Sequence, residues 1–120
     1  MNPDPASIRP RFSVIFVVDN GGTVSSMGVV RLAADDPATA WAAAETTVTR
    51  AYQDSGIDID ETYVDIVAVA LGKVRLTADP VRGRGVNVID VAADGTYTVN
   101  GLPPSPRPAE ATLNELNYGR

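Results

Sequence analysis

A strong turn signal, Asn20 to Gly22, lies between two apolar runs near the start of the chain. Asn and Gly tolerate the positive φ angles of a tight hairpin, so the segment predicts a β-hairpin with strands Phe12–Val18 and Thr23–Leu32. A three-residue loop pairs Val18 with Val24 and collects the larger apolar side chains on one face. That face comprises Phe12, Val14, Phe16, Val18, Val24, Val30 and Leu32.

A helix is predicted directly after the hairpin. Asp36 suits its N-cap, Pro37 its first position and Gly56 the left-handed position after its end. In the predicted register Ser26 and Gly28 lie opposite Phe16 and Val14, and their small size leaves room for the helix to approach the sheet. The predicted inward stripe is Trp41, Ala44, Val48, Ala51 and Tyr52, with Trp41 as its large anchor. The predicted water-facing residues are Glu45, Thr46, Thr49, Arg50 and Gln53.

Three more strands are predicted in the second half of the chain. Residues Tyr63–Leu71 are apolar on both faces, which predicts a central strand. Gly72 predicts a bulge, after which Val74 and Leu76 continue the alternation. Strands Val86–Val91 and Thr96–Asn100 form a second hairpin around Asp94-Gly95.

The resulting order, β-β-α-β-β-β, predicts a single α+β domain with a mixed or antiparallel twisted sheet and one helix on one face. Residues 11–100 form the predicted core, which 120 residues are enough to build. Residues 1–10 form an extended N-terminal arm. Residues 101–120 form a Pro-rich C-terminal arm with a short helix carrying Leu113 and Leu116. Both arms could lie on a neighbouring subunit or remain disordered tails.

One helix covers only one face of a sheet. The other face carries Ile15, Val17, Met27 and Val29, and this apolar surface needs a cover. Curling of the sheet, a tail or a second subunit could provide it.

The chain has no His and no Cys, which removes the commonest general base, the commonest metal ligand and every thiolate site. No catalytic, metal-binding or cofactor-binding residue is therefore predicted. The net charge of −5 argues against a general nucleic-acid binder. No apolar run is long enough to span a bilayer, so no membrane partner is expected.

Two polar clusters remain. Asp54, Asp58, Asp60, Glu61 and Asp65 could attract a hard cation, but they lack EF-hand spacing and read as a solvated loop. Arg82 and Arg84 alternate with glycines, and with Arg75 they could present forked donors to phosphate or carboxylate. No P-loop or dinucleotide fingerprint accompanies them.

These features predict a non-enzymatic interaction or structural protein whose partner is itself or a larger assembly. The candidate contact residues are Ile15, Val17, Val29, Arg75, Arg82, Arg84, Leu113 and Leu116. Two alternatives stay open: a small inhibitor or regulator of a cellular protein, and a nucleic-acid-binding module at the three arginines. A bias to Arg, Ala, Val, Asp and Gly suggests a high-GC genome or one of its phages, and a cytoplasmic protein or a particle component.

Overall fold

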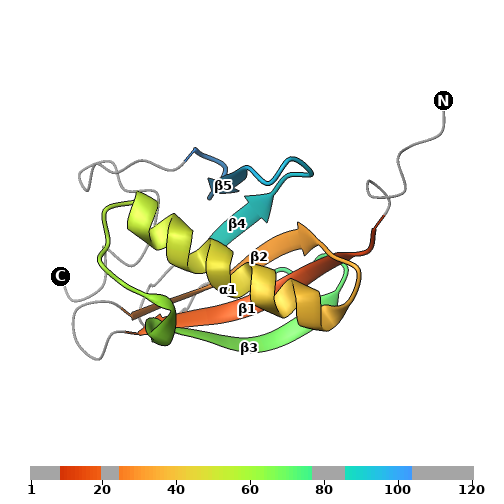
Figure 1. Cartoon of the computed structure of the whole chain (residues 1–120), viewed down its shortest axis with the longest axis horizontal. Helices are drawn as coiled ribbons and strands as arrows, with labels where there is room; N and C mark the ends of the chain where they lie inside the picture. Colours follow the sequence, from red (N-terminus) through yellow and green to blue (C-terminus); the bar gives the residue numbers. More distant parts are fainter. Residues whose placement is uncertain (1–8, 20–24, 77–85, 104–120) are drawn as a thin grey trace.

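A five-stranded sheet with one helix across it forms the protein in the computed structural model (Figure 1). The structure describes residues 9–19, 25–76 and 86–103. The elements are β1 (Arg11–Asp19), β2 (Ser25–Ala33), α1 (Pro37–Asp54), the 3-10 turn η2 (Glu61–Tyr63), β3 (Val64–Leu71), β4 (Asn87–Val91) and β5 (Tyr97–Val99). The strand order is β3-β1-β2-β4-β5, and the predicted α+β domain is confirmed. The predicted arms lie almost wholly outside the described residues.

The sheet is mixed. β1 is antiparallel to β2 and β3, β2 is parallel to β4, and β4 is antiparallel to β5. Strands β2, β3 and β4 therefore run the same way and are joined by two crossovers. The first carries α1 over one face, and the second begins at Gly72, after which Val74 lies against the other face.

The register of the first hairpin differs from the predicted one by two residues. Val18 pairs with Ser26 and Phe16 with Gly28, so a three-residue loop is wrong. A shift of two leaves every side chain on its predicted face, because side chains alternate with period two. The predicted core face is accordingly buried at Phe12, Val14, Phe16, Val18, Val30 and Leu32, while Val24 lies outside the described residues.

Helix α1 begins and ends where its caps predict. The Asp36 carboxylate accepts a hydrogen bond from the Thr39 amide at 2.7 Å, and Pro37 follows in the first turn. Gly56 adopts φ +85°. Behind it, the amide of Ile57 donates to the carbonyl of Tyr52 at 2.9 Å, which closes a Schellman motif.

The buried face of α1 contains four of the five residues of the predicted stripe and differs from the prediction at Trp41 and Thr49. Trp41 is 42% exposed, and Ala40 beside it is buried instead. Thr49, predicted to face water, is buried with its hydroxyl bonded to the Glu45 carbonyl at 2.9 Å. Small side chains let the helix approach the sheet closely, and the large anchor is Tyr52, whose ring meets Phe16 edge-on.

Strand β3 lies at an edge of the sheet, not at its centre. The bulge is also elsewhere: Ile15 pairs with Ala68 and Phe16 with Ile66, which leaves Val67 as the extra residue. Gly72, at φ +88°, ends the strand. The predicted strand continuation through residues 73–76 is wrong, because these residues leave the sheet plane to begin the second crossover.

The space at Gly28 is filled by β4 and Phe16. A Cβ at this position would lie 2.2 Å from the Asn87 carbonyl oxygen and 2.6 Å from Phe16 Cζ. The expectation that Gly28 makes room for the helix is therefore wrong. Ser26, two residues earlier, does meet the helix, because its hydroxyl bonds to that of Tyr52.

The second hairpin is confirmed, with Gly95 at φ +88° in its turn and the Ala92 amide donating to the Thr96 carbonyl at 2.8 Å. Among the described residues, no helix has the length and apolar character needed to cross a membrane.

Candidate binding surfaces

The face of the sheet opposite α1, called here the outer face, is covered in part by the chain itself. The Ser13 hydroxyl donates to the Gly72 carbonyl at 2.7 Å and accepts from the Val74 amide at 2.9 Å, so the start of the second crossover lies on this face. This cover was not among the three expected from the sequence. Ser13 and Val29 are completely buried. Val29 is therefore not available as the contact residue that the sequence predicts.

The outer face stays partly open away from the crossover. Ile15 and Val17 are half-buried, and Met27, which pairs with Val17, is 36% exposed. Ile15 and Val17 lie on β1, which pairs with the edge strand β3, and on that strand Val67 is 60% exposed and Leu71 is 74% exposed. The most exposed large apolar side chains of the described residues thus include two on a single strand.

The two edge strands of the sheet, β3 and β5, differ in length and in how far their outer backbone groups are paired. β5 has three residues, and Val99 forms a bridge with Leu102 just beyond it. β3 has eight residues and, within the described part of the chain, pairs only with β1. The outer N–H and C=O groups of β3 are therefore the long open edge of the described sheet.

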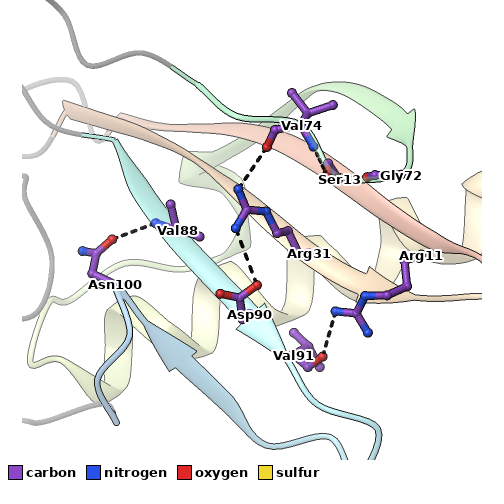
Figure 2. Close-up of polar contacts among 9 residues, drawn as sticks. All are labelled: Arg11, Ser13, Arg31, Gly72, Val74, Val88, Asp90, Val91 and Asn100. Carbon is purple, nitrogen blue, oxygen red and sulfur yellow. Dashed lines mark hydrogen bonds and ion pairs between the residues drawn. The ribbon is translucent and has the colours of Figure 1, made fainter. Parts of the chain in front are cut away.

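A cleft of about 370 Å³ opens on the outer face where the second crossover begins. Its lining residues come from four separate segments: Arg11, Phe12, Arg31, Gly72, Lys73 and Asp90. Figure 2 shows Arg31 between the crossover and β4, with Arg11 directed toward the end of β4. We call this the cationic cleft, because it joins three cationic side chains with one carboxylate.

Arg31 is the most enclosed of the three cations. Its side chain is 16% exposed, and Nη2 donates to the Val74 carbonyl at 3.1 Å. Nη1 lies 3.9 Å from the Asp90 carboxylate, which is a long ion pair. The buried Nε has no acceptor among the described residues. Such a donor is unusual in a folded protein, because an unpaired buried polar group is costly.

Strand pairing explains how these residues meet. Ser13, Arg31 and Asp90 lie side by side on β1, β2 and β4, because Arg31 pairs with both of the others. Arg11 is diagonal to Arg31, since its own partner is Ala33. Diagonal neighbours on a sheet are about 7–8 Å apart, within reach of arginine side chains.

A second hollow lies between α1 and η2 and is lined by polar residues: Thr46, Thr49, Arg50, Gln53, Asp60, Glu61 and Thr62. It includes part of the acidic cluster. Asp60 caps the 3-10 turn, and hydrogen bonds from the Thr62 hydroxyl and amide lower the pKa of its carboxyl. Asp54 accepts from the Tyr97 hydroxyl. In the described ranges no three acidic residues converge as a metal site would require.

The remaining shifted groups also belong to turns and packing. Hydrogen bonds from Thr39 lower the pKa of Asp36, and those from Thr96 lower the pKa of Asp94. Burial, with the Asp54 contact second, raises the pKa of the Tyr97 hydroxyl. Each shift has a local structural cause, and the shifted groups do not gather in either hollow.

The other sequence-predicted contact residues divide into two groups. Arg75 is exposed on the crossover. Arg82, Arg84, Leu113 and Leu116 lie outside the described residues and stay predictions. The sequence alone did not identify Arg11, Arg31, Lys73 and Asp90 as a group. The alternation of β2 places Arg31 on the outer face, but nothing local predicts β4 as its neighbour.

Comparisons of the chain with protein-family models, with curated proteins and with solved structures gave no match.

Proposed function

We propose that this protein is a non-enzymatic interaction protein that assembles with a second copy of itself through the open edge of β3. The observation that carries the proposal is the edge strand itself, eight residues long with Val67 and Leu71 largely exposed. A strand of this length offers a row of backbone donors and acceptors to another strand.

Natural proteins protect edge strands in several ways, which include charged side chains, proline, bulges and a covering segment. Residues Val64–Leu71 contain no lysine or proline, and the protective features within the strand are Asp65 and the bulge at Val67. The bulge at Val67 interrupts the strand, so pairing is expected in its second half, centred near Val69. About that centre, Val67 of one copy lies opposite Leu71 of the other, and both lose their exposure.

Charge supports a second copy as the partner. Acidic residues lie at the start of β3 and in the turn before it: Asp60, Glu61 and Asp65. Basic residues, Lys73 and Arg75, follow its end. In a two-fold antiparallel pair, the start of one strand lies beside the end of the other, so each acidic end meets a basic end.

The expected complex is a weak one. Stable interfaces bury about 1,200–2,000 Å² in total, and one edge strand with its flanking side chains reaches only the lower part of that range. An exchanging dimer of this kind fits a subunit of a larger assembly, including the phage-type accessory role suggested by composition, and a protein acting in the cytoplasm. The lack of His and Cys supports a role without catalysis.

Sedimentation velocity over a wide concentration range tests the proposal. The unchanged protein is expected to show a monomer–dimer equilibrium, and Val67→Lys is expected to weaken it about tenfold or more by placing charge in the paired edge. Ala42→Lys is the matched control, because Ala42 is exposed on α1. A protein that stays monomeric at every concentration, or equal weakening by both variants, would contradict the proposal.

A charge exchange tests the antiparallel arrangement. Asp65→Lys and Lys73→Glu are each expected to weaken the dimer, and the double variant is expected to recover most of the loss. A double variant as weak as the two single effects added together would mean that these ends do not meet.

A further inference from the structure

We propose that the cationic cleft binds a small oxyanion carrying about two negative charges, such as the phosphate group of a small organic phosphate or a dicarboxylate. The proposal concerns the outer face of the sheet, and Lys73 is the one residue that it shares with the proposed dimer contact at β3.

The charges that line the cationic cleft do not balance. Arg11, Arg31 and Lys73 contribute three positive charges to the cleft, and Asp90 contributes one negative charge. The cleft therefore has a surplus of two positive charges in a chain whose net charge is −5. A dianion restores neutrality, and a partly enclosed cleft strengthens its attraction to the cations.

The hydrogen bonding of the Arg31 guanidinium is incomplete. This guanidinium is mostly enclosed, yet its carboxylate partner is 3.9 Å away and its Nε has no acceptor among the described residues. A buried cation is stable when it is paired and fully hydrogen-bonded. An oxyanion is the acceptor that a guanidinium recognises best, through paired N–H donors.

Arg11 and Lys73 are available as further hydrogen-bond donors beside Arg31. The Arg11 side chain donates a long hydrogen bond to the Val91 carbonyl at 3.4 Å, and the residue is exposed. Lys73 is exposed at the mouth of the cleft. Both side chains can turn toward a ligand without breaking a strong contact.

The size of the cleft limits the ligand. A volume of about 370 Å³ lies near the lower end of the range for small-molecule sites, about 300–1,000 Å³. Nucleic acid is not the favoured ligand, because these cations are gathered at one cleft and do not form a long basic track.

Titration of the ¹⁵N-labelled protein at low salt tests the site, with inorganic phosphate, phenyl phosphate and succinate as separate probes. Amide shifts are expected at residues 11–13, 31, 72–74 and 90. A response to both phosphates alone identifies a phosphoryl site, and a response that includes succinate identifies a general dianion site. No saturable shift with any of the three probes would overturn the proposal.

Substitutions of the cations and of the carboxylate in the cleft are expected to change ligand affinity in opposite directions. Lys73→Gln and Arg31→Gln are each expected to weaken binding about tenfold or more, since charged hydrogen bonds are lost. Asp90→Asn is expected to tighten binding several-fold by removing the competing carboxylate. Arg50→Gln, exposed on α1, is the matched control and should change nothing. If Arg31→Gln does not fold, the variants at the exposed Lys73 and the half-exposed Asp90 still test the proposal. Weaker binding by Asp90→Asn, or equal effects of the Lys73 and Arg50 variants, would refute the proposal.

Discussion

Replacing Gly28 with Ala is expected to separate β2 from β4. The new Cβ would lie 2.2 Å from a main-chain oxygen of Asn87 and 2.6 Å from Phe16 Cζ. Nonbonded heavy atoms reach their best distance at about 3.5 Å or more, so the carbonyl has to move by roughly 1 Å. Rotation of the Phe16 ring can relieve its own contact, but the carbonyl is fixed by the parallel pairing of β4.

Because the Asn87 carbonyl is held in place, Gly28→Ala is expected to lower the free energy of unfolding. Overpacking typically destabilises a core by about 1–3 kcal/mol, and contact with main chain places Gly28→Ala at the upper end, about 3 kcal/mol. That is a large part of the about 5–15 kcal/mol by which small domains are stable. Urea unfolding followed by circular dichroism measures the loss. Hydrogen exchange at Val88 and Ile89 is expected to accelerate more than exchange at β1.

Gly101→Ala provides the comparison. Gly101 has φ +83° and open space around it, so Ala there brings backbone strain of about 1–2 kcal/mol and no collision. The reasoning is refuted if Gly28→Ala costs no more than Gly101→Ala, or if β4 keeps its protection. Adding Phe16→Leu to Gly28→Ala should not restore stability, because the Asn87 carbonyl remains in place.

Two further substitutions test the polar contacts of α1. Tyr52→Phe removes a buried hydroxyl that bonds Ser26 and accepts from Asn87 Nδ2 at 3.2 Å. We expect it to lower the free energy of unfolding in urea by about 1–3 kcal/mol, and to lower it by less when Ser26→Ala is also present. A double variant whose loss equals the sum of the two single losses would contradict this coupling. Tyr97 has a raised pKa, so its neutral form stabilises the fold below the ordinary tyrosine pKa and this contribution is lost as pH rises through the folded value. Tyr97→Phe should therefore flatten the alkaline decline of stability. An unchanged decline in melting temperature between about pH 9 and 12 would rule out the ionisation of Tyr97 as its cause.

Local signals predicted local structure well. The caps of α1 at Asp36 and Gly56 and the turn at Gly95 depend on hydrogen bonds and φ angles within a few residues, and the sequence places them correctly. Alternation predicted the core face of the first hairpin for the same reason. It could not fix the register, because the true pairing of Val18 with Ser26 and the expected one with Val24 bury the same face.

Features that depend on distant segments were harder to predict. Trp41 is exposed because α1 meets the sheet through its small residues, and hydrophobicity alone favours the larger side chain. β3 is apolar on both faces although it is an edge strand, so composition misplaced it at the centre. The cationic cleft combines Arg31 with Asp90 through a parallel strand pair, for which the sequence carries no turn signal.

The parallel pair of β2 and β4 also determines the order in which the chain can assemble. Gly28 and Asn87 pair although they are roughly sixty residues apart, whereas β1 and β2 are joined by a short connection. Closing a long loop costs entropy before any contact repays it, so the C-terminal hairpin is expected to dock last and to open first. Asp90 leaves the cleft in every such opening. Because Asp90 competes with the proposed oxyanion for Arg31, a bound anion favours the opened state, and the exchange of β4 amides is expected to accelerate as the cleft fills.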